Sequence, residues 1–133
     1  MQLRILPHAF SVCRVADFSE VRLESEFCFI GRTDEERSLV CLTEDVPGNT
    51  LAREDGWQAF RVEGPLDFSL TGILAELSAV LARNGIPIFA LSTYNTDYIL
   101  TKEDDFPKAA GVLAASGHKL LSADPVRSLI GPG

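Results

Sequence analysis

Apolar residues between positions 70 and 81 recur with the period of an α-helix. They stand at i, i+3, i+4, i+7 and i+11 and draw one apolar stripe: Leu70, Ile73, Leu74, Leu77 and Leu81. Two residues that cap helices well, Asp67 and Ser69, precede the stripe, and Arg83 and Gly85 follow it with a cation and a residue suited to a left-handed turn. The pattern predicts a helix that begins near position 70 and ends before Gly85.

Two apolar runs joined by a polar elbow follow this helix. Ile86–Leu91 is apolar at every position, Tyr98–Leu100 is apolar again, and the elbow Ser92–Asp97 between them carries hydroxyl, amide and carboxylate groups. We interpret the runs as the strands of a hairpin. Because side chains alternate along a strand and these runs are apolar on both sides, each face of the hairpin needs a cover. We expect helices on one face and a second sheet or a second subunit on the other.

A second helix and two flanking strands complete the C-terminal half. Glu103–Asp105 suits the positive end of a helix, Pro107 fits only a first turn, and Ser116-Gly117 suits its end. Trp57–Gly64 alternates as a strand before the first helix, and His118–Leu121 forms a short strand after the second. The resulting order, β-α-β-β-α-β, predicts a ferredoxin-like α+β domain at 57–133, in which two helices cover one face of a four-stranded antiparallel sheet.

The N-terminal half predicts strands and little helix. Its apolar runs are short: Leu3–Leu6, Phe10–Val15, Glu26–Gly31 and Ser38–Glu44. A charged turn, Arg32–Arg37, separates the last two. The stretch from Pro47 to Gly56 combines a PGNT turn signal with charged residues, so we expect a loop there and a boundary between two modules. Residues 1–56 then form a truncated, mostly β module in front of the ferredoxin-like domain.

Charge and motif content narrow the function classes. The chain has 133 residues and a formal charge of −7, which disfavours nucleic acid and anionic membrane surfaces. It shows no signal peptide pattern and no apolar run long enough to span a membrane, so we expect a cytoplasmic protein. Phosphate-binding loops, GxSxG and HExxH motifs are absent from the sequence, so we expect no enzyme and no cofactor.

The cysteines and histidines do not suggest a metal site. Cys13, Cys28 and Cys41 lie in apolar surroundings without CxxC spacing, and His8 and His118 are far apart in the sequence. We expect three reduced, buried thiols that behave as small hydrophobes, and no metal.

The stretch GIPIFALSTYNTDYILTKEDDF, from Gly85 to Phe106, resembles the second repeat of CASTOR-type arginine sensors and, more loosely, the regulatory ACT domains of aspartate kinases. Two N-terminal stretches, LRILPHAFSVCRVA and FCFIGRTDEERSLVCLTE, resemble the truncated first ACT-like repeat of the same sensors. The resemblance implies a tandem ACT protein that pairs its domains, within the chain or across a homodimer, and binds a small ligand, usually an amino acid, at a domain interface.

The resemblance also implies where a ligand binds. The loop Gly64–Gly72 matches the ACT loop that contacts ligand, although it reads GPLDFSLTG where many ACT domains have Asp-x-Pro-Gly. Asp97, beside Thr93 in the elbow, is the first candidate for the cationic group of a ligand, and Asp67 is the second. The complete set of predicted ligand-binding residues is Asp67, Phe68, Ser69, Thr71, Gly72, Phe89, Ser92, Thr93 and Asp97.

Simpler interpretations of these residues remain. Asp67 and Ser69 are more often helix caps than ligand contacts, and the elbow can be a turn that its own side chains solvate. Two functions therefore stay open: a non-catalytic regulatory module that binds an amino acid, and a ligand-independent dimerisation or interaction module with ACT architecture. A protein partner that it regulates in trans is expected in the first case, and the sequence does not identify it.

Overall fold

The computed structural model describes residues 1–63 and 72–122, and its chain divides into two compact units. One unit combines Met1–Pro7 with the residues from Gln58 onward; because it contains both α-helices, we call it the helical unit. The other, His8–Trp57, is the strand unit. The long strands β1 (Gln2–Val15) and β4 (Thr50–Val62) contribute residues to both units. Asp67, Phe68, Ser69 and Thr71 of the predicted site lie outside the described residues.

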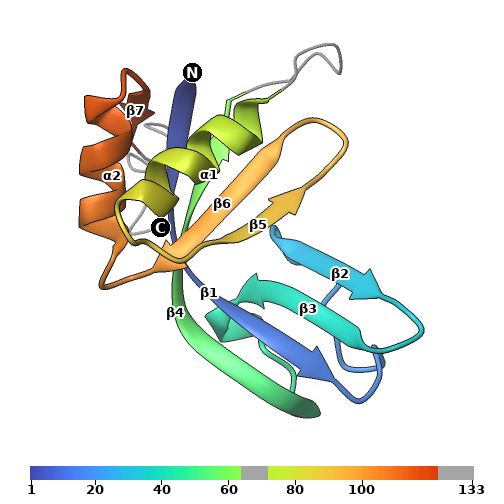
Figure 1. Ribbon diagram of the computed structural model, residues 1–133. Helices are drawn as coiled ribbons and strands as arrows, with labels where there is room; N and C mark the ends of the chain where they lie inside the picture. The colour runs from blue at the N-terminus through green and yellow to red at the C-terminus, as the bar shows by residue number, and fades with distance from the viewer. Residues whose placement is uncertain (64–71, 123–133) are drawn as a thin grey trace. The chain divides into compact units, whose positions relative to one another are not determined.

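The helical unit confirms the predicted α+β fold class. After β4 come α1 (Ile73–Arg83), β5 (Phe89–Ser92), β6 (Asp97–Lys102), α2 (Phe106–Ala115) and β7 (Lys119–Leu121), which is the expected β-α-β-β-α-β order (Figure 1). The strands β5 and β6 form the predicted hairpin, with Ser92 paired to Asp97 at its turn and Phe89 paired to Leu100 at its base. Within residues 1–63 and 72–122, no helix has both the length and the apolar character needed to cross a membrane.

The helices of this unit bury the residues that the periodicity selected. Leu77 and Leu81 of α1 and Leu113 of α2 are fully buried and join one core with Phe60, Val62 and Ile99 of the sheet. Phe60 and Phe106 stack with ring centroids 4.3 Å apart, which joins β4 to the start of α2. Gly72 and Gly85, with φ of 80° and 71°, flank α1 in the left-handed region that glycine tolerates best. The two helices therefore cover one face of the sheet.

The sequence predicted a strand near the N-terminus but not its place in this sheet. The strand order in the helical unit is β7-β1-β4-β6-β5, so the start of β1 lies between β4 and β7 and the sheet has more than the four expected strands. Gln2–Arg4 pairs in parallel with Lys119–Leu121, and the Glu63 backbone N–H donates to the Gln2 carbonyl at 2.9 Å. Fully buried Leu3 adds its side chain to the core. The parallel pairing joins β1 near the start of the described chain to β7 near its end. Local residue patterns do not indicate that two strands so far apart in the sequence pair with each other.

The strand unit corrects two expectations for the N-terminal half. Its sheet contains β2 (Cys28–Arg32), β3 (Arg37–Leu42), the end of β1 and the start of β4 in the order β2-β3-β1-β4, with one short 3-10 helix, Thr43–Asp45. The two predicted strands before Val15 are one strand, β1, although Pro7 interrupts the pattern. The predicted loop from Pro47 to Gly56 was wrong beyond Asn49, because β4 begins at Thr50. Its residues Leu51–Asp55 are exposed, so a strand forms there without an apolar pattern.

Candidate functional site

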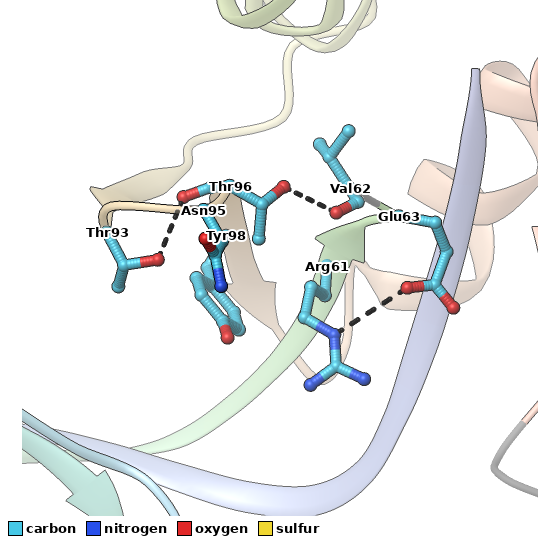
Figure 2. Close-up of a pocket in the computed structure, with 7 residues that line it drawn as sticks. All are labelled: Arg61, Val62, Glu63, Thr93, Asn95, Thr96 and Tyr98. Atoms are coloured by element: carbon cyan, nitrogen blue, oxygen red, sulfur yellow. Dashed lines mark hydrogen bonds and ion pairs between the residues drawn. The ribbon is translucent and has the colours of Figure 1, made fainter. Parts of the chain in front are cut away.

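A pocket of about 290 Å³ lies in the helical unit where the end of β4 meets the elbow between β5 and β6. The last two residues of β4 and Glu63 after them supply one side of the pocket. The elbow supplies hydroxyl and amide groups, and Tyr98 on β6 supplies a phenol (Figure 2). The lining residues are Arg61, Val62, Glu63, Thr93, Asn95, Thr96 and Tyr98. Apart from Val62, every one of these side chains carries a polar group.

Hydrogen bonds within the elbow set its shape. The backbone N–H of Thr93 donates to the Thr96 carbonyl at 2.9 Å, and the Thr93 hydroxyl donates to the same oxygen at 3.2 Å. Thr96 is 7% exposed, and its hydroxyl donates to the backbone carbonyl of Val62 (Figure 2). This last bond joins the elbow to the end of β4, and so it brings the two sides of the pocket together.

Opposite charges line the β4 side of the pocket. The Arg61 and Glu63 side chains project from the same side of the strand because they are two residues apart. Arg61 Nε lies 3.9 Å from Glu63 Oε2, and Arg4 Nε donates to Glu63 Oε1 at 2.6 Å. Arg4 is itself held by a hydrogen bond of 2.9 Å from its terminal nitrogen to the Ser122 carbonyl. Each oxygen of the Glu63 carboxylate thus faces a different arginine.

These groups suit a small polar ligand that carries both charges. A guanidinium such as that of Arg61 binds a carboxylate with paired hydrogen bonds, and a carboxylate such as that of Glu63 accepts from an ammonium. The side chains of both residues are partly exposed, at 32% and 26%, so they can reach a ligand. Hydroxyl and amide groups of the elbow add donors and acceptors. The volume is at the lower end of the range for ligand pockets, which starts near 300 Å³.

Among the predicted ligand residues that the structure describes, only Thr93 lines this pocket. Asp97 is half-buried and its carboxylate accepts a hydrogen bond from the Ser92 hydroxyl at 2.6 Å, so the two residues bind each other across the hairpin. Asp97 and the pocket residue Tyr98 are neighbours on β6, and successive side chains point to opposite faces of a sheet. Phe89 is half-buried on β5, and Gly72 precedes α1. A ligand role for these residues stays a prediction.

Sequence reasoning did not select the charged residues of the pocket. Both Arg61 and Glu63 lie on the predicted strand Trp57–Gly64, and no motif in the sequence singles them out. Phe60 and Val62, which alternate with them, are buried in the core. The available signal was a pair of opposite charges at i and i+2, on the polar side of a strand that leads directly into the loop matched to the ACT ligand loop.

Comparisons with known protein families and sequences each match about half of the chain. The model of a family described as ACT domain matches residues 52–115. Proteins from Rattus norvegicus and Mus musculus, each named cytosolic arginine sensor for mTORC1 subunit 1, are 33% identical over 70 residues, which is 52% of this chain. The matched region spans 21% of the length of these relatives.

Comparisons with solved structures extend over nearly the whole chain. Protein Atu0741 from Agrobacterium tumefaciens is 35% identical, with a TM-score of 0.79, covering 92% of this chain and 93% of that one. An aspartate kinase from Clostridium acetobutylicum is 13% identical, with a TM-score of 0.62, covering 82% of this chain and 33% of the kinase. At that identity, the likeness to the kinase supports the fold alone.

Proposed function

Because residues 52–115 belong to the ACT domain family, we propose that the protein is a regulatory module that binds an amino acid in the pocket between β4 and the β5–β6 elbow, without catalysis of its own. The family and its amino-acid-sensing relatives support the regulatory role. The observation that carries the ligand class is the opposed pair of charges, Arg61 and Glu63, in a pocket of about 290 Å³. The similar proteins from rat and mouse are named as arginine sensors, so arginine is the first amino acid to test in the screen described below.

In the proposed complex, Arg61 binds the α-carboxylate of the amino acid and Glu63 accepts from its ammonium. Arg4 orients the Glu63 carboxylate through the bond of 2.6 Å. Thr93, Asn95 and Tyr98 then contact the ligand side chain and select among amino acids. The predicted loop residues Asp67, Phe68, Ser69, Thr71 and Gly72 follow Glu63 in the chain, and we retain them as additional contacts.

The regulatory version of the proposal includes a homodimer in the cytoplasm. On the hairpin, half-buried Phe89 and Leu91 lie on the face opposite Ile99, which belongs to the helix-covered core, while Leu100 on the same face as Phe89 is already buried within the chain. A second ACT unit that covers this apolar face would place a ligand at an interface between domains. Ligand binding would then change the geometry of the dimer. A partner protein that binds one dimer geometry more tightly would respond to the ligand, and a coupling free energy would link ligand binding to partner binding.

Thermal unfolding of the full chain against the twenty amino acids tests the proposal. An amino acid at a hundredfold over its Kd stabilises the protein by about 2.7 kcal/mol, which raises the midpoint by several degrees for a chain of this size. We expect one or two amino acids to give such a shift. Sedimentation at micromolar concentration in parallel reports the dimer.

Two arginine variants make the test specific to the pocket. Arg61→Gln is expected to weaken binding by about tenfold or more, because a hydrogen bond to a charged group contributes about 1.5–3 kcal/mol. Arg14 is exposed on β1 and does not line the pocket, so the Arg14→Gln variant should bind the amino acid with the affinity of the wild type. Equal affinity in Arg61→Gln would reject the proposed site. No shift with any amino acid, together with a stable dimer, would favour the ligand-independent interaction module instead.

A further inference from the structure

Three cysteines that are distant in the sequence come together in the strand unit. Cys13 lies on β1, Cys28 on β2 and Cys41 on β3, and these strands are adjacent in the order β2-β3-β1. All three belong to one apolar cluster with Val15 and Leu39. Cys13 and Cys41 are buried as predicted, whereas Cys28 is only half-buried, so one thiol of the cluster reaches the surface.

The strand register distinguishes the three thiols. Cys28 is the direct partner of Cys41 in the antiparallel pair β2–β3. Cys41 faces Ser11 on its other side, while Cys13 faces Leu39, two residues along β3. Directly opposite side chains lie on the same face of a sheet and are nearest neighbours, whereas Cys13 and Cys41 are diagonal neighbours.

The hydrogen-bond alternation of the hairpin places Cys28 and Cys41 at a close pair. The Thr33 N–H donates to the Glu36 carbonyl at 3.0 Å, so these two residues form a hydrogen-bonded pair. Pairs alternate along an antiparallel ladder, and the unbroken register from Arg32–Arg37 to Cys28–Cys41 makes the cysteines a non-hydrogen-bonded pair. The Cα atoms of such a pair are about 4.5 Å apart, within the range of about 4.4–6.8 Å that a disulfide spans. A diagonal pair, at about 7–8 Å, lies beyond it.

We propose that Cys28 and Cys41 form a reversible disulfide site, which low-molecular-weight disulfides of the glutathione class oxidise and small thiols reduce. In the first step the Cys28 thiolate attacks the reagent disulfide, forming a mixed disulfide and releasing one reagent thiol. The Cys41 thiol then loses its proton to solvent, attacks the Cys28 sulfur and displaces the second reagent thiol. Two protein S–H groups become one S–S bond, and the reagent disulfide is reduced to two thiols.

The surroundings give the two cysteines these separate roles. Burial, together with smaller contributions from the nearby thiols and Asp45, raises the pKa of the Cys41 thiol to about 12. Burial also raises the pKa of Cys28, but its side chain is half-buried and can meet a reagent. Cys28 therefore reacts first and Cys41 second, and the exchange is slow at neutral pH because only the thiolate reacts. A bond of this kind would join β2 to β3 at the end of the hairpin opposite its turn.

Oxidised glutathione applied to the reduced full-length protein tests the site. After incubation at about pH 8.5, near the ordinary thiol pKa, the intact mass should fall by two hydrogen atoms, and peptide mapping should link Cys28 to Cys41. Dithiothreitol should restore the original mass. The Cys13→Ser variant should form the same bond, and the Cys28→Ser variant should form none.

Several outcomes would overturn the proposal. One is a protein that keeps all three thiols after oxidised glutathione and also after the dithiol oxidant diamide. Others are a glutathione adduct that persists on Cys28 beside a free Cys41, and a mapped bond that includes Cys13. Because the wild-type peptide map alone identifies the linked pair, the result stands even where a serine variant fails to fold.

Discussion

At the scale of single residues, the candidate site depends on Thr96. This residue belongs to the polar elbow, where the sequence alone indicates a solvated turn, yet its side chain is 7% exposed and bonds to the Val62 carbonyl. Its neighbours in the elbow, Thr93, Tyr94 and Asn95, are exposed. One buried hydroxyl therefore joins the elbow to β4, while the adjacent polar groups stay accessible to a ligand.

Replacing this hydroxyl tests its role. Thr96→Val keeps the side-chain shape but removes the donor to the Val62 carbonyl, and an unsatisfied buried group costs about 1–3 kcal/mol. We expect the free energy of unfolding to fall by that amount in urea titrations. Thr93→Val removes only the bond of 3.2 Å from an exposed hydroxyl to a carbonyl that still accepts from the Thr93 N–H, so it should lower the free energy of unfolding by only about 0.5 kcal/mol. Equal effects of the two substitutions would show that the Thr96 bond contributes nothing particular.

At the scale of elements, helix α1 shows how local pattern and burial agree. Of its eleven residues, Leu77, Val80 and Leu81 are buried, and they lie at i, i+3 and i+4 along the face that meets the sheet. The hairpin β5–β6 supplies Ile99 to the same core. Packing of this apolar face, more than helix propensity, holds α1 in place.

A leucine truncation measures the stabilisation from that face. Leu77 is fully buried, so Leu77→Ala should lower the free energy of unfolding by about 2–5 kcal/mol through lost burial and the cavity that remains. Leu51 is 62% exposed on β4, and Leu51→Ala should change it by less than about 0.5 kcal/mol. The free energy of unfolding of both variants is measured by denaturant titration. A small loss at Leu77 would mean that α1 does not bury this face in solution.

At the scale of the whole molecule, the ferredoxin-like sheet takes one of its strands from the start of the chain. Met1–Pro7 belongs to the helical unit, with β1 between β4 and β7, although some fifty residues of the strand unit intervene in the sequence. Leu3 of this strand is fully buried in the core beside Phe60 and Val62. The helical unit is consequently incomplete without the N-terminal strand.

Removing this strand tests its contribution. A fragment that begins at Thr50 keeps β4 to β7 but loses β1, so it exposes the core around Leu3 and leaves strand edges without partners. We expect its unfolding midpoint to lie clearly below that of the full chain. A synthetic peptide of residues 1–15 should raise the midpoint in a saturable way, and the same peptide with Leu3→Asp should not. A fragment as stable as the full chain would contradict the role of β1.

The sequence by itself determined the features that arise from neighbouring residues. The helical period from Ile73 to Leu81, the hairpin with its polar elbow and the proline in the first turn of α2 all reflect contacts within a few positions, so residue pattern predicts them. The order of these elements then identified the fold class, and the resemblance around Gly85–Phe106 identified the family. The sequence pattern predicted a loop where the charged start of β4 forms a strand. An exposed strand buries neither face, so its sequence shows no alternation of apolar and polar residues.

The tertiary structure decided which distant residues meet. The insertion of β1 between β4 and β7, the pairing of Cys28 with Cys41 and the contact between Arg4 and Glu63 depend on strand order and register. Both are selected by the packing of the whole core, and residues far apart in the chain carry no local sign of their partner. For this reason the elbow could be predicted as a candidate site from its polar residues, whereas its contact with the end of β4, beside Arg61 and Glu63, could not.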